Sequence, residues 1–126
     1  MKKIIVAALA AFVASAAVAQ AAPPTLGQWL ARQRALAAQG PVDLESAAFK
    51  ALYADLATAL AAGRAAHNAD LAAGRPPAAC LPPPGQQQLD WNMVNGWLRA
   101  RPEAEQAQSL NEVIGRFLRE KFPCPR

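Results

Sequence analysis

Apolar residues recur at intervals of three and four along most of the chain, which is the spacing of one face of an α-helix. No segment alternates apolar and polar residues in the manner of a half-buried strand. The longest apolar stripe follows Asp43 and places these residues on one face: Phe49, Leu52, Tyr53, Leu56, Leu60, Gly63, His67 and Leu71. The pattern therefore predicts an all-α fold, a small four-helix bundle.

Residues typical of helix ends bound the four predicted helices. Thr25 and Gln28 have the spacing of a capping box, and Gly40 suits a left-handed turn after the first helix. Asp43 is a good N-cap for the second helix, and Pro102 suits the first turn of the fourth. The helices are expected at about residues 26–38, 44–73, 87–100 and 102–121.

Two features of these helices concern packing. The third helix has apolar residues over a wide arc: Leu89, Trp91, Met93, Val94, Trp97 and Leu98. An arc of this width is typical of a helix that is central in a bundle, or of one that shares a second face with a partner chain. Gly63 interrupts the stripe of the second helix, so we expect either a break there or the close approach of another helix.

The N-terminus has the pattern of a secretory signal. A lysine pair precedes the uncharged apolar run at 4–18, and small residues follow up to Ala21. We therefore predict a cleavable signal peptide over residues 1–21 and one helical domain over 22–126. A retained membrane anchor is the alternative, but the apolar run is short for a membrane span. The predicted location is the periplasm of a bacterium.

Charge argues against a nucleic-acid partner. The chain has 13 basic and 9 acidic side chains, but Lys2 and Lys3 belong to the predicted signal. The mature chain therefore carries 11 basic and 9 acidic side chains, a net charge of +2, and its basic residues are scattered. Nucleic-acid binding needs a concentrated basic surface. No later segment is apolar enough for stable membrane insertion after cleavage.

Cys80 and Cys124 are the two cysteines. In an oxidising compartment a single pair is most simply one disulfide. It would close a loop of about 44 residues and tie the C-terminus to the end of the second helix. The alternatives are two free thiols or half of a metal site, and one histidine is too few to complete an ordinary zinc site.

Candidate catalytic groups are sparse. His67 is the only histidine, and its place on the apolar stripe indicates a core histidine, or else a pair with Asp70. Ser46 and Ser109, the serines of the predicted mature chain, fall inside predicted helices and outside any nucleophile-elbow motif. No glycine-rich phosphate loop occurs. We therefore expect a protein that is not an enzyme and has no cofactor and no metal ion.

The C-terminal half resembles a known family. Its pattern is Cys80-Leu81-Pro82, a helix that ends in Trp97-Leu98 before Pro102, a helix that ends in Phe117-Leu118, and then Phe122-Pro123-Cys124. Over residues 80–124 this pattern resembles the Rap/Tai family of periplasmic immunity proteins of type VI secretion systems. The resemblance implies a homodimer that binds a peptidoglycan-cleaving amidase effector, blocks its active-site cleft and performs no chemistry.

Contact residues for such a partner are expected on the third helix and on the turn after it. Predicted exposure beside the wide apolar arc, rather than a matched family contact, selects Asn92, Asn95, Arg99, Arg101 and Glu103. An alternative function is that of a small periplasmic helical chaperone or stress protein, which would bind unfolded clients through exposed apolar surface. The chain has few groups that could serve an acid switch in such a protein.

Overall fold

The computed structural model describes residues 22–86 and 89–125, so the predicted signal peptide lies outside the described residues. Four α-helices follow one another: α1 (Leu26–Ala37), α2 (Ala47–Ala72), α3 (Trp91–Arg99) and α4 (Leu110–Lys121). A 3-10 turn, η1 (Glu103–Glu105), precedes α4. Within the described ranges there is no strand, only an isolated bridge between Thr25 and Ser109. The all-α prediction is confirmed.

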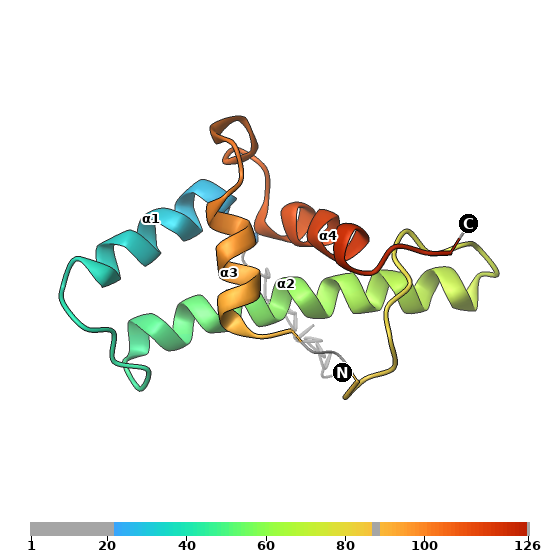
Figure 1. The fold of residues 1–126 in the computed structure, drawn as a ribbon, viewed down its shortest axis with the longest axis horizontal. Helices are drawn as coiled ribbons and strands as arrows, with labels where there is room; N and C mark the ends of the chain where they lie inside the picture. Colours follow the sequence, from blue (N-terminus) through green and yellow to red (C-terminus); the bar gives the residue numbers. More distant parts are fainter. Residues whose placement is uncertain (1–21, 87–88, 126) are drawn as a thin grey trace, which may run out of the picture.

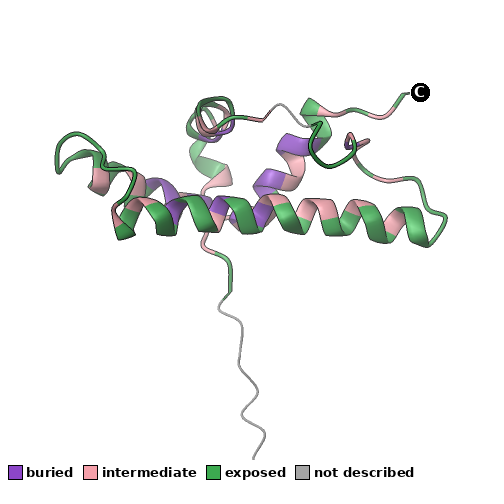
Figure 2. Cartoon of the chain, turned by 90° about the horizontal axis from the view of Figure 1, so that it is seen from below, coloured by how far each residue is buried: buried purple, intermediate pink, exposed green. Residues whose placement is uncertain are grey.

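The long helix α2 is the axis of the molecule (Figure 1). Helix α1 lies along its N-terminal half and α4 along its middle, while α3 crosses in front of α2 between them (Figure 1). The Trp29 indole N–H of α1 donates a hydrogen bond to the Leu52 carbonyl of α2 at 3.1 Å, in a buried setting. Figure 2 shows that buried residues gather around the middle of α2 and that both of its ends are exposed.

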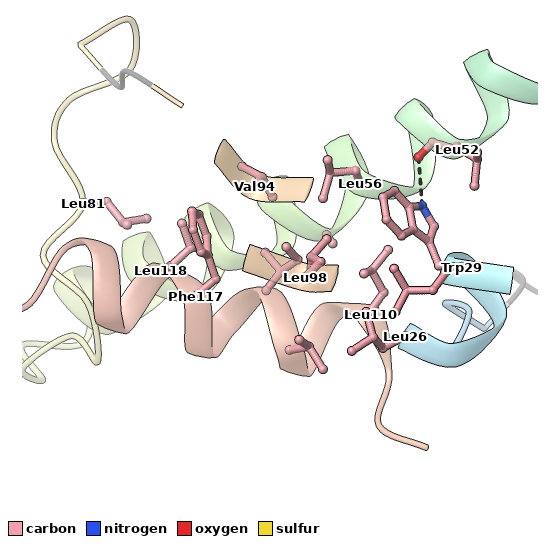
Figure 3. Close-up of a cluster of buried hydrophobic side chains, with 14 residues drawn as sticks. Leu26, Trp29, Leu52, Leu56, Leu81, Val94, Leu98, Leu110, Phe117 and Leu118 are labelled. Carbon is pink, nitrogen blue, oxygen red and sulfur yellow. Dashed lines mark hydrogen bonds between the residues drawn. The ribbon is translucent and has the colours of Figure 1, made fainter. Parts of the chain in front are cut away.

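All four helices contribute to one apolar core (Figure 3). The side chains that are wholly buried, at 0% exposure, are Leu26, Trp29, Leu98, Leu110, Val113 and Ile114. No polar or charged residue among those described is buried. The predicted stripe on α2 is buried only in part, because Leu52 and Leu56 enter the core while Tyr53 and Leu71 are more than half exposed.

The ends of α1 and α2 follow local hydrogen bonding. Thr25 and Gln28 form the predicted capping box, and Gly40 takes a positive φ of 117° in the turn after α1. The N-cap predicted at Asp43 is wrong. The Asp43 carboxylate instead accepts from the Glu45 N–H, and the Ser46 hydroxyl accepts from the Phe49 N–H. Ser46 therefore caps α2 rather than lying inside it.

The predicted starts of the third and fourth helices are also too early. Asp90 accepts from the Met93 N–H, so α3 begins at Trp91 rather than near residue 87. The segment at Pro102 forms only the short turn η1, and Ser109 accepts from the Glu112 N–H to begin α4. Each helix starts where a side-chain oxygen satisfies a free backbone donor.

Helix α3 is not central in the bundle. Only Val94 and Leu98 are buried, Trp91 and Trp97 are half-buried, and Met93 is 37% exposed. The crossing position of α3 lets one face pack inward and leaves the rest of the wide arc at the surface. A second face shared with a partner chain stays a prediction.

The predicted disulfide is present. The sulfur atoms of Cys80 and Cys124 lie 2.04 Å apart, and the Cys80 N–H also donates to the Phe122 carbonyl at 2.9 Å. The Arg64 guanidinium of α2 donates to the Pro82 carbonyl at 2.6 Å. These contacts hold the extended connector after α2 against both α2 and the end of α4. Of the helices in the described part, none has both the length and the apolar character needed to cross a membrane.

Gly63 marks a close approach rather than a break in α2. A Cβ atom at this position would lie 2.3 Å from Cδ1 of Leu118, whose side chain is only 3% exposed and has little room to move. We expect Gly63→Ala to lower the free energy of unfolding by about 1–2 kcal/mol, because overpacking outweighs the better helix propensity of alanine.

Gly96 of α3 supplies the matched control for this prediction. A Cβ atom there meets nothing within 4 Å, so Gly96→Ala should raise the free energy of unfolding by about 0.5–1 kcal/mol. Urea unfolding of both variants measures the difference. A stabilising effect of Gly63→Ala would contradict the close approach of α4.

Candidate functional site

A groove lies among α1, the loop that joins it to α2, the start of α2, and α3. Its volume is about 430 Å³. The larger apolar side chains that line it are Leu36, Val42, Leu44, Phe49, Leu52 and Trp91. The polar side chains are Gln33, Arg34, Asn92, Asn95 and Arg99. Such a surface, which combines large apolar side chains with amides and arginines, has the composition of a protein-binding site.

Trp91 is the centre of an aromatic cluster beside the groove. Its ring centroid lies 5.8 Å from that of Trp29, 5.3 Å from that of Phe49 and 6.1 Å from that of Tyr53. Aromatic pairs at these separations are favourable beyond the area that they bury. The cluster joins α1, α2 and α3, so one wall of the groove rests on three helices.

An amide pair connects the two helices on either side of the groove. The Gln33 side-chain amide of α1 donates to the Asn95 side-chain carbonyl of α3 at 2.7 Å, in a part-buried setting. Each amide has further donor or acceptor positions beyond this bond. The pair therefore links the two helices and has polar atoms left for further hydrogen bonds.

The charged side chains that line the groove are both basic. Arg34 and Arg99 are its charged lining residues, and both are exposed. Neither makes a salt bridge with the residues that the structure describes, in contrast to Arg32, which pairs with Asp55 at 2.6 Å. Of the residues that the structure describes, no acidic one lines the groove. Its edge is therefore basic.

The structure divides the five predicted contact residues into two groups. Asn92, Asn95 and Arg99 line the groove. The Arg101 guanidinium lies 3.9 Å from the centroid of the Trp97 ring, and Arg101 Nε donates to the Trp97 carbonyl at 3.1 Å. Glu103 is exposed in η1. The last two belong to the turn between α3 and α4, outside the groove. The contact of all five residues with a partner stays a prediction.

The other side of the groove was not predicted from the sequence. Gln33 and Arg34 come from the polar face of α1, and Val42 and Leu44 from a loop. The sequence did contain a signal for Val42 and Leu44, which are 42% and 62% exposed. Two large apolar residues in a loop belong to no helix stripe, and exposed apolar residues can mark an interaction site.

His67 fits neither predicted environment. It is half-buried, and its Nδ1 lies 3.4 Å from the side-chain oxygen of Asn68, while the Asp70 carboxylate binds Arg75 at 3.1 Å. The prediction of a core histidine and its alternative, a pair with Asp70, are both wrong, because His67 lies at the half-buried margin where α2 faces Leu81 and Leu118, and Arg75 pairs with Asp70. Within the described ranges, no three His, Cys, Asp or Glu side chains form a metal-binding group.

No family model, curated protein sequence or solved structure matches the chain. The resemblance over residues 80–124 to the Rap/Tai family therefore stays a prediction.

Proposed function

We propose that this protein is a periplasmic immunity protein that binds and inhibits a peptidoglycan amidase delivered by type VI secretion. The observation that carries the proposal is the groove beside Trp91, whose apolar lining and basic edge are suited to a protein segment. The resemblance over residues 80–124 supports the choice of an amidase as the partner. Inhibition would be stoichiometric, because the protein covers the cleft of the enzyme and transforms nothing.

The residues of the groove suit binding rather than catalysis. Its polar groups are the amides of Gln33, Asn92 and Asn95 and the guanidinium groups of Arg34 and Arg99. Amides and arginines hydrogen-bond a partner, whereas acyl transfer and hydrolysis need a nucleophile, a general base or a metal-bound water. Tryptophan and arginine are also the residue types enriched where protein interfaces gain most of their affinity.

Two exposed leucines provide a matched test. Leu44 is 62% exposed at the groove, and Leu71 is 56% exposed at the far end of α2. We expect Leu44→Asp to weaken binding of the cognate amidase by about tenfold or more, because it places a charge in a contact made by an apolar side chain. Leu71→Asp should leave the affinity unchanged.

The measurement uses the mature chain and the type VI amidase effectors encoded in the same genome. Calorimetry gives affinity and stoichiometry, and release of peptidoglycan fragments gives inhibition. Binding of none of these amidases would contradict the immunity proposal. Equal affinity of the wild type and Leu44→Asp would contradict the use of the groove.

A periplasmic chaperone is the second candidate, and one observation favours it. Large apolar side chains are exposed at several separate places: Val42, Leu44, Tyr53, Leu71 and Met93. A protein that binds unfolded clients uses such dispersed surface. In that case Leu44→Asp and Leu71→Asp should both reduce the suppression of client aggregation, so the same two variants distinguish the candidates.

A further inference from the structure

We propose that the groove binds an acidic segment of its protein partner, in which an aspartate or glutamate is flanked by large apolar side chains. The proposal rests on the proposed function only in that the partner is a protein. It adds which chemical groups of that partner the groove binds. Three features carry it: the basic edge, the apolar lining and the amide pair between α1 and α3.

Charge complementarity decides the sign of the segment. Arg34 lies in the last turn of α1 and Arg99 in the last turn of α3, so the two guanidinium groups approach the groove from two different helices. Neither has an acidic partner among the described residues, and no carboxylate lines the groove. A carboxylate of the partner would satisfy a guanidinium with paired hydrogen bonds.

Two neighbouring arginines differ from Arg34 and Arg99 in already having partners within the chain. Arg32, on the same helix as Arg34, is paired with Asp55 of α2. Arg101, close to Arg99 in sequence, lies over the Trp97 ring. Their guanidinium groups already have intramolecular contacts, whereas those of Arg34 and Arg99 face the groove without one.

The lining requires apolar side chains beside the acid. Leu36, Phe49 and Trp91 are half-buried, and Val42 and Leu44 are exposed from the loop. Covering this surface removes apolar area from water and supplies most of the binding free energy. The volume of about 430 Å³ is in the range of sites that take a small ligand, so it suits a short segment with two or three side chains.

The amide pair suits the backbone of such a segment. The bond from Gln33 to Asn95 leaves the Gln33 carbonyl oxygen and the Asn95 amide hydrogens for other partners. A peptide backbone presents donors and acceptors alternately along its length. The pair can therefore accept from a peptide N–H and donate to a peptide carbonyl while it keeps its own bond.

Matched peptides test the proposal. Capped hexapeptides are made with Leu, Phe, Trp or Val around one Asp or Glu, and each has a twin with Asn or Gln in place of the acid. The mature protein is immobilised, and mass spectrometry compares the retention of each acidic peptide with that of its twin. We expect retention of the acidic peptides to be higher by roughly fivefold, and the difference to shrink at high salt.

Variants connect this preference to the groove. The double variant with Arg34→Gln and Arg99→Gln should retain acidic peptides and their amide twins about equally. Its retention of the amide twins should be the same as that of the wild type. Arg119→Gln changes an exposed arginine of α4 outside the groove and serves as the control. Equal retention of acidic and amide peptides by the wild type, or an acidic preference that survives in the double variant, would overturn the proposal.

Failure of this proposal is distinct from failure of the proposed function. If an amidase binds with an affinity that Leu44→Asp lowers, but the peptides show no acidic preference, the immunity function stands and the acidic segment is rejected. If the peptides show the preference but no amidase binds, the immunity function is rejected and the acidic segment stands. The acidic loop of a second copy, around Asp43 and Glu45, is the competing occupant. Loss of a dimer in sedimentation of the double arginine variant, without any peptide preference, would overturn the proposal in favour of that copy.

Discussion

Replacing Cys80 and Cys124 with serine is expected to lower the free energy of unfolding by about 4 kcal/mol, as the chain-entropy model gives for a closed loop of this length. The two residues are separated by 44 positions, and the loop between them contains α3, η1 and α4. For a domain of this size the loss corresponds to a melting temperature lower by on the order of 20 °C.

The position of the disulfide explains why the effect should be large. The described residues of the connector form no helix, and Leu81 is the one of them that is buried in the core. Apart from the disulfide, the hydrogen bonds of Cys80 to the Phe122 carbonyl and of Arg64 to the Pro82 carbonyl hold it to the bundle. Without the covalent bond, this segment has few contacts to restrain it.

Thermal unfolding followed by circular dichroism measures this effect. The wild type with a reductant should melt at the temperature of the double serine variant, and the variant itself should not respond to reductant. This control separates loss of the bond from the change in side chain. An unchanged melting temperature of the reduced wild type would contradict a stabilising disulfide.

Trp29→Ala is expected to lower the free energy of unfolding by about 4 kcal/mol. The Trp29 side chain is fully buried between α1, α2 and α3, and its indole N–H donates to the Leu52 carbonyl. Alanine leaves a cavity in the core and removes the hydrogen bond that the indole adds to the Leu52 carbonyl of α2. Since a domain of this size is stable by only about 5–15 kcal/mol, the loss is a large share of the total.

Two further variants separate the components of this loss. Trp29→Phe keeps much of the volume and removes the hydrogen bond, so we expect a smaller decrease of about 1–3 kcal/mol. Tyr53→Ala removes an aromatic ring that is 55% exposed and should lower the free energy of unfolding by no more than about 1 kcal/mol. Urea unfolding gives the three values. A cost of Trp29→Ala equal to that of Tyr53→Ala would contradict the central place of Trp29 in the core.

The groove combines a predicted side and an unpredicted one. Asn92, Asn95 and Arg99 share a face of α3, and helical spacing is enough to place them together. Gln33 and Asn95 are separated by 62 positions, and only the packing of α1 beside α3 brings their amides into contact. Arg101 follows Arg99 closely in sequence but lies over Trp97, four positions before it, and so outside the groove.

The sequence by itself determined the features that depend on neighbours a few residues apart. The helical spacing and the capping box at Thr25 could be predicted from it. At Gly63 it left a break and a close approach open, and only the packing of α4 decided for the approach. The two cysteines could be paired because the sequence has no third one. Capping and periodicity are local, because they join atoms within one or two turns.

Only the tertiary structure decided which faces meet. Tyr53 and Leu71 lie on the same stripe as Leu52 and Leu56, yet they are exposed. Leu71 lies beyond the part of α2 that is buried (Figure 2), whereas Tyr53 lies beside Trp91 at the margin of the packed face. The groove exists because the loop after α1 and the start of α3 meet beside Trp91. Such contacts depend on the packing of segments far apart in the chain, which spacing along one helix does not specify.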